Sequence, residues 1–154
     1  MKALTIWQPW ASLIAMGIKT VEWRGWPAPR WVVGQRLVIH AGMTDPRGHV
    51  RDLLVSEARL RGSLGPQADI AKAREALQQW SGRPFLLPRG AGLCTVVLGQ
   101  PKRADLLGFT VPAGSAPNFA WPLEELVAWD EPVDCRGAQG FWNWPLPLDG
   151  ARPA

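Results

Sequence analysis

The sequence predicts a protein of the α+β class, a small mixed β-barrel of five to six strands flanked by helices. Short β-prone or apolar runs recur along the chain, and the helical stretches between them do not follow the regular rhythm of βαβ units. At 154 residues the chain is long enough for one domain with its own core. Two cysteines are too few for a disulfide scaffold. The expected single domain spans residues 1–148, with 149–154 as a loose tail.

The first part of the chain is expected to hold a strand, a short helix and two further strands. Residues 3–6 are β-prone, and Pro9 suits the first position of a helix because its φ is fixed and its missing N–H costs nothing there. This helix of about two turns should end at Gly17, since glycine favours the left-handed conformation that follows a helix. Strands are expected over 21–26 and 35–41.

The middle of the chain, about 45–90, is expected to be a helical insertion packed on the barrel. Asp45 is a good N-cap, and apolar residues recur at helical spacing from there to about residue 60. A turn over 62–66 separates this helix from a second one over 67–80.

The last part of the chain should return to strands. Residues 93–98 form a continuous apolar run, which is typical of a strand covered on both faces. Residues 119–123 alternate between apolar and other side chains as in a strand. The next stretch, 124–129, fits either a strand or a helical turn, and a final strand is expected over 140–146.

The charge of the chain is compatible with a polyanionic partner without establishing one. The formal net charge is +4, and arginine outnumbers lysine by 13 to 4, beside ten tryptophans and no tyrosine. Arginine and tryptophan can clamp phosphates and stack on bases. A GC-rich coding bias and a tryptophan-heavy core would give the same composition. The pairing of Cys94 and Cys135 is left open.

The expected location of the protein is based on the search for membrane-spanning and secretion segments in the sequence. No apolar run reaches the roughly 18 residues of a membrane-spanning helix. The apolar start of the chain is broken by Gln8 and Pro9, and no small-residue cleavage pattern follows it. We therefore expect a cytoplasmic protein without a membrane partner.

One short stretch brings three ionisable residues together. Glu22 and Arg24 are two positions apart, so on a strand they point to the same face, with Thr20 beside them. Lys19 has the opposite parity and joins them only if it lies in the turn just after Gly17. The alternative is a solvated strand face with an ion pair that contributes little.

Four blocks, in order along the chain, closely resemble the ASCH domain family. They are the run 7–12 with Gly17-x-Lys19-x-x-Glu22-x-Arg24, Gly34 ahead of the strand 37–41, the apolar stretch 92–98 with the segment 119–123, and the closing block 132–142. The resemblance implies a fold similar to the PUA-like superfamily. It also implies a cleft lined by Lys19, Glu22 and Arg24, with Arg136 and Gln139 on the opposite wall. Such domains are generally taken to bind RNA or modified nucleosides.

The leading expectation is therefore an RNA- or nucleotide-binding domain, with single-stranded DNA as a further candidate ligand and no cofactor. Lysine and arginine neutralise phosphates, and a carboxylate accepts hydrogen bonds from exocyclic base amines. Trp26 is a candidate for stacking on a base. Core packing is expected for Trp7 and Trp10, and for Trp23, which lies on the strand face opposite Glu22.

Whether the protein is an enzyme stays open, with a metal-independent hydrolase as the alternative. Some similar proteins remove an acyl group from acetylated cytidine with a threonine at the fourth position of the motif, but that position here is Glu22, and Thr20 is a weak substitute. Cleavage of RNA would use Glu22 or His40 as the base. The two cysteines and two histidines do not have zinc-ligand spacing. A further alternative is a site for another anionic small molecule.

Overall fold

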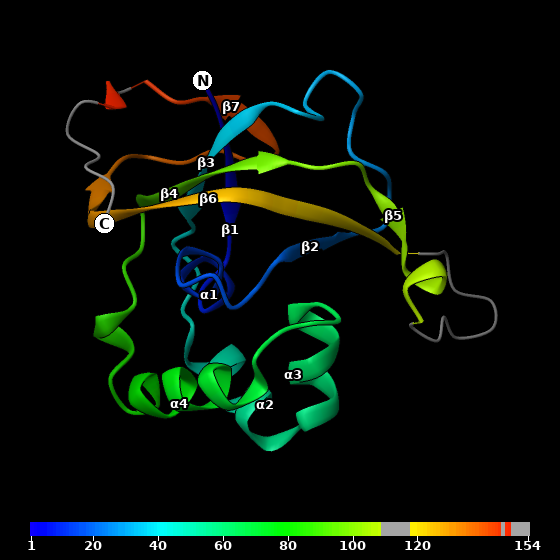
Figure 1. Cartoon of the computed structure of the whole chain (residues 1–154). Coiled ribbons are helices and arrows are strands. Elements are labelled where there is room, and N and C mark those ends of the chain that lie inside the picture. Colours follow the sequence, from blue (N-terminus) through cyan, green and yellow to red (C-terminus); the bar gives the residue numbers. More distant parts are fainter. Residues whose placement is uncertain (109–117, 146, 149–154) are drawn as a thin grey trace.

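The structure is a computed structural model that describes residues 1–108, 118–145, 147 and 148. Its strands form one mixed sheet in the order β2-β6-β4-β3-β1-β7, with the short β5 paired to β6. The strands are β1 (Lys2–Ile6), β2 (Val21–Arg24), β3 (Arg36–Ala41), β4 (Ala91–Leu98), β5 (Lys102–Arg103), β6 (Phe119–Asp134) and β7 (Phe141–Asn143). The sheet curls into a half-barrel above a layer of helices (Figure 1). The predicted α+β class with a small mixed barrel is confirmed.

The sheet contains one parallel pair, β1 with β3, while its other pairs are antiparallel. β4 is buried at almost every position, as predicted for a strand covered on both faces. The stretch 124–129, which fitted two conformations, is strand, because β6 pairs with β4 through it, for example Thr95 opposite Val127, with a register shift between Thr95 and Val97. The final strand, β7, covers three residues and is therefore shorter than the predicted strand over 140–146. The predicted tail, 149–154, lies outside the described residues.

Helix α1 (Trp10–Ala15) follows β1 after three residues, and Gly17, just past the C-cap Met16, has the predicted left-handed conformation with a φ of 71°. The backbone N–H groups of Ile18 and Lys19 both bond to the carbonyl oxygen of Leu13, at 2.9 and 3.0 Å. Lys19 therefore belongs to the turn between α1 and β2 and not to the strand.

The helical segment differs from the prediction, because the helix expected from Asp45 to about residue 60 is two helices. These are α2 (Arg47–Val55) and α3 (Glu57–Leu64). Ser56 separates them with an extended backbone, and its side chain accepts a hydrogen bond from the N–H of Arg59, as an N-cap does. The turn predicted over 62–66 is also wrong at its start, since Gly62 lies inside α3.

Helix α4 (Ile70–Trp80) begins three residues later than predicted. Asp69 is its N-cap and accepts a hydrogen bond from the N–H of Lys72. A short 3₁₀ turn, η1 (Pro84–Leu86), then leads towards β4, and a second one, η2 (Ala104–Leu107), follows β5. Among the described residues, no helix is both long and apolar enough to cross a membrane.

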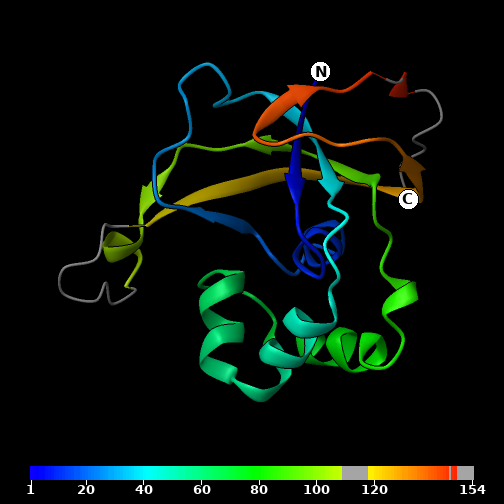
Figure 2. The ribbon, with the colours of Figure 1, turned by 180° about the vertical axis from the view of Figure 1, so that it is seen from behind.

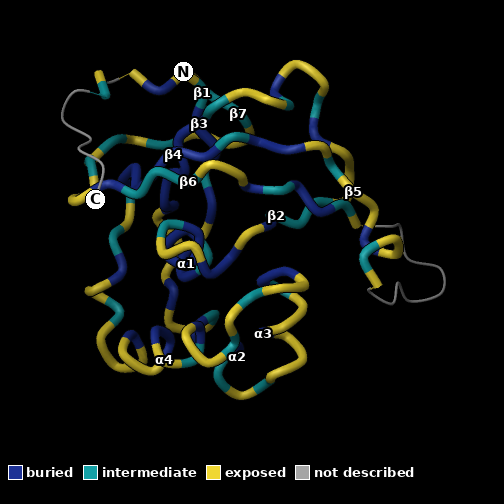
Figure 3. Tube along the Cα trace, viewed as in Figure 1, coloured by how far each residue is buried: buried dark blue, intermediate teal, exposed yellow. Residues whose placement is uncertain are grey.

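Three hydrophobic clusters hold these layers together. The first fills the inside of the curled sheet and is closed by α1, which contributes Ala11 and Ile14. The second joins Leu13 and Ile18 to the buried faces of α2, α3 and α4, so the helical segment packs mainly on α1. The third covers the other face of β1 and β3 with Trp129 and Trp144. Figure 2 shows α1 between the sheet and the remaining helices, and Figure 3 shows their exposed outer surfaces.

Both cysteines are free thiols in this arrangement. Cys94 is buried in β4, and this burial raises the pKa of its thiol to about 12. Cys135 follows β6 and is half-buried.

Candidate functional site

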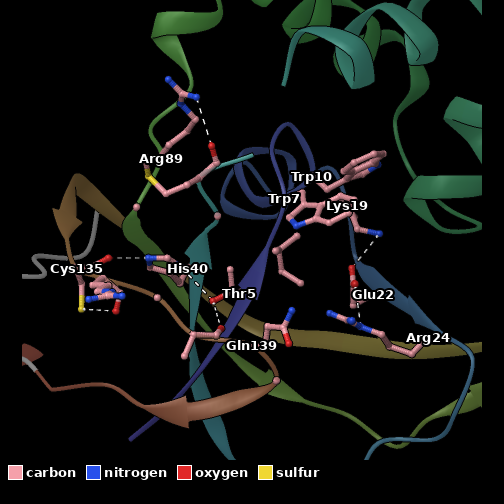
Figure 4. Close-up of a pocket in the computed structure, with 18 of the residues that line it drawn as sticks. Thr5, Trp7, Trp10, Lys19, Glu22, Arg24, His40, Arg89, Cys135 and Gln139 are labelled. Carbon is pink, nitrogen blue, oxygen red and sulfur yellow. Dashed lines mark hydrogen bonds and ion pairs between the residues drawn. The ribbon is translucent and has the colours of Figure 1, made fainter. Parts of the chain in front are cut away.

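A cavity of about 1380 Å³ lies where β1, β2 and the end of β3 meet the last turn of α3 and the segment after β6. All seven residues singled out from the sequence line its wall: Lys19, Glu22, Arg24, Trp26, His40, Arg136 and Gln139. Figure 4 shows Glu22 and Arg24 on one side of this space, with His40 and Cys135 on the other and Gln139 between them. Segments far apart in the sequence thus face one another across a common space.

The three ionisable residues of the motif form one cluster. Glu22 Oε2 lies 3.6 Å from Lys19 Nζ, and Glu22 Oε1 lies 3.2 Å from Arg24 Nε. Lys19 reaches the cluster from the turn after α1, as the parity of the sequence required. One carboxylate between two cations leaves the cluster with an excess of positive charge.

Lys19 is the most deeply buried member of this cluster, at 3% exposed. Its Nζ donates a hydrogen bond of 2.6 Å to the carbonyl oxygen of Ser63, in the last turn of α3. Burial lowers the pKa of Lys19; its contacts with Glu22 act in the opposite direction, and the nearby Arg24 lowers it further. The helical segment therefore supplies part of the site.

Arg24 is the more accessible cation, with 29% of its side chain exposed. Its contact with Glu22 uses Nε, and within the described part of the chain its two Nη groups form no hydrogen bond. The guanidinium lies over the ring of Trp121, 5.7 Å from the ring centroid. Arg24 is thus held in place while its outer edge stays open towards the cavity.

His40 is 1% exposed and has a contact at each ring nitrogen. Its Nε2 lies 2.8 Å from the carbonyl oxygen of Cys135, and its Nδ1 lies 3.2 Å from Thr5 Oγ1. A carbonyl can only accept, so Nε2 donates. The single proton of the Thr5 hydroxyl is donated to the carbonyl oxygen of Ala138 at 2.8 Å. His40 and Thr5 together tie the segment after β6 to the sheet.

Gly137 allows the segment after β6 to approach His40 and Thr5 closely. A Cβ atom at Gly137 would stand 2.6 Å from His40 Nδ1 and 3.1 Å from Thr5 Oγ1, which leaves no room for a side chain. The attached segment carries Arg136 and Gln139, both exposed, into the wall of the cavity. His40 therefore positions this wall.

Most of the tryptophans lie either in the core or at the cavity. Trp80, Trp121, Trp129 and Trp144 are buried. Trp7 and Trp26 are 54% and 58% exposed and line the cavity, so the core position predicted for Trp7 is wrong. Trp10 and Trp23 are half-buried and line the cavity as well, and Trp10 also packs against two of the hydrophobic clusters.

Several residues of the wall were missed from the sequence, among them Thr5, Met43, Ser63 and Arg89. Arg89 lies near the cavity edge and donates a long hydrogen bond of 3.4 Å to the carbonyl of Met43. A basic residue in the loop before a strand was the only signal available for it. Thr20, the substitute nucleophile, is exposed and is not part of the wall. In the described ranges, no three or more His, Cys, Asp and Glu side chains are placed to hold a metal ion.

The curled mixed sheet with helices on one side is an α+β fold. The chain belongs to the ASCH domain family, because the ASCH domain model matches residues 4–97, more than half of the chain. A comparison with curated proteins found no match.

Among solved structures, the chain is similar to the ASCH protein of Zymomonas mobilis, with 14% identity and a TM-score of 0.46 over 86% of this chain and 72% of that one. Two single-site mutants of the same protein match at 14% and 15% identity, with a TM-score of 0.45 for each. Each match covers 86% of this chain, and the shares of the mutant chains covered are 72% and 74%.

Proposed function

We propose that this cavity binds RNA or a nucleotide, with Lys19, Glu22 and Arg24 as its charged floor. The observation that carries the proposal is the ion cluster itself, in which two cations share one carboxylate beside an exposed aromatic wall. The family supports this reading, since ASCH domains are generally thought to bind RNA.

The charges of the site suit a phosphate group. The open Nη edge of Arg24 is the geometry with which arginine binds phosphate bidentately. Arg89 and Arg136 add two exposed cations to the lining of the cavity. The carboxylate of Glu22 and the amide of Gln139 are groups that can bond to base edges.

The proposal is tested by titrating RNA and single-stranded DNA octamers at about 50 and 200 mM salt, the range over which phosphate contacts weaken strongly. We expect Arg24→Ala to weaken binding roughly tenfold to a hundredfold, since hydrogen bonds to charged groups contribute about 1.5–3 kcal/mol. The slope of log affinity against log salt should fall by about 1.

A matched control is available in Arg36. It is 32% exposed and also pairs with a glutamate, Glu125, but it does not line the cavity. Arg36→Ala should bind like the parent. If Arg24→Ala binds both octamers as tightly as the parent at low salt, the proposal is wrong.

A hydrolase acting on RNA or a modified nucleoside is the second candidate. The observation that favours it is the carboxylate of Glu22 between Lys19 and Arg24, because a carboxylate can act as a general base while two cations stabilise developing negative charge. His40 is less suited to this role, since both of its ring nitrogens have contacts within the protein.

Catalysis is tested by incubating the same RNA octamer and acetylated cytidine with the protein and following products over time. Product formation that disappears in Glu22→Gln while octamer binding persists would support the enzyme. Activity that is unchanged in Glu22→Gln would come from a contaminant or another site. The expected loss for a general base is about 10²–10⁴-fold.

A further inference from the structure

We propose that the exposed indole of Trp7 is a stacking platform for one unpaired base, so that the cavity selects single-stranded over double-stranded nucleic acid. This inference rests on the proposed function and adds a ligand class and a binding residue to it. Trp7 has three features that suit this role: a fixed backbone, a ring supported by a second ring, and a large exposed surface within the cavity.

The backbone of Trp7 is fixed on both sides. Ile6, at the end of β1, is 4% exposed, and its carbonyl accepts a hydrogen bond of 2.8 Å from the N–H of Gly42. Gln8 is fully buried, and its side chain bonds to Ser12 and to the carbonyl of Pro88. The carbonyl of Trp7 itself accepts from Ala11 in α1 at 3.1 Å.

The ring of Trp7 is braced from the helical layer. It stacks on the imidazole of His49 in α2, with ring centroids 5.6 Å apart and planes 20° from parallel. The same imidazole contacts Trp10 at 4.8 Å, so one histidine supports two indoles of the cavity wall. Gly42 leaves room for the ring, because a Cβ there would stand 3.3 Å from Trp7 Cδ1.

Although its backbone and ring are held in place, Trp7 is 54% exposed, so part of the apolar surface of its ring is available to a ligand. Burying an indole against another ring is favourable, and every nucleic-acid base has a flat face that can use it. Trp7, Glu22 and Arg24 line the same cavity, so a strand bound there can place a base on Trp7 and phosphate groups near Arg24. A base inside a duplex has both faces covered, so only an unstacked base fits.

The test compares a uridine RNA octamer with an abasic octamer that has the same number of phosphates, and both with an RNA duplex. The uridine octamer should bind more tightly than the other two. Trp7→Ala should weaken binding of the uridine octamer by about 5- to 150-fold, as expected for the loss of one stacked base, and leave the abasic octamer unchanged. Trp7→Phe should keep part of the preference for the uridine octamer over the abasic octamer.

Trp31 supplies a matched control, because it is 56% exposed but does not line the cavity. Trp31→Ala should bind both octamers like the parent. Equal binding of the two octamers by the parent, or an equal loss for both in Trp7→Ala, would overturn the platform and leave phosphate binding in place. If the parent binds neither octamer at low salt, the proposed function fails as well.

Discussion

His40 is a buried residue of the cavity lining whose two ring nitrogens both lie against other parts of the chain. Through Thr5 and the carbonyl of Cys135, it attaches the segment that carries Arg136 and Gln139. Gly137 packs against its ring, where any larger residue would collide. The role of His40 is therefore to place one wall of the cavity relative to the other.

The ionisation of His40 predicts a pH dependence of stability. Burial lowers the pKa of His40 from 6.5, so between the lowered pKa and 6.5 the unfolded chain binds more protons than the folded one. The free energy of unfolding should fall as the pH drops through this window, by at most about 1.4 kcal/mol per pH unit. Urea unfolding between about pH 7.5 and 5 measures it.

The matched variants for this prediction are His40→Gln and His49→Gln, since the chain has two histidines. The free-energy difference between the parent and His40→Gln should shrink on acidification, whereas His49→Gln should retain the contribution of His40. An identical pH dependence in the parent and His40→Gln would contradict the prediction.

Single residues were predictable from the sequence where local geometry decides. Strand parity required Lys19 to lie outside β2, and the conformation of Gly17 followed from its place after a helix. The exposure of Trp7 was not predictable in this way. It depends on the cavity and on His49, which the fold brings from a distant part of the sequence.

Helix α3 is the element on which local sequence and structure disagree. Gly62 and Pro66 suggested a turn, but Gly62 lies inside the helix, and the break falls earlier, at Ser56. Ser56 was a usable signal, because serine is a preferred N-cap. The strand conformation of 124–129 could not be decided locally, since the hydrogen bonds that select it come from β4.

This difference gives an element-scale prediction. Gly62→Ala should raise the free energy of unfolding by about 0.5–1 kcal/mol, because alanine favours helix and, apart from adjacent residues and the helix's own backbone, no described heavy atom lies within 4 Å of the new Cβ. Gly65→Ala should destabilise instead, since Gly65 has a φ of +119° and its Cβ would stand 3.1 Å from Val21. Chemical unfolding of both variants checks this, and a destabilised Gly62→Ala would refute it.

At the scale of the whole molecule, the strands of the sheet were easier to predict from the sequence than the packing of the helical segment against the rest of the fold. The strands have strong apolar patterns of their own, and their approximate positions were confirmed. The helical segment was expected to pack on the barrel, yet its buried face meets Leu13 and Ile18 beside α1. Ser63 reaches the cavity through this packing, and Met43 and Arg89 reach it from the ends of β3 and β4, so no local pattern marked them.

The hydrogen bond between Lys19 and Ser63 affects the electrostatics of the cavity. Ser63 lies in the last turn of α3, and the carbonyl end of a helix carries a partial negative charge of about half an elementary charge. Lys19 thus faces a negative helix end on one side and Glu22 on the other. The helix end offsets part of the positive charge of Lys19, while Arg24 is the more exposed of the two cations, with 29% of its side chain accessible against 3% for Lys19.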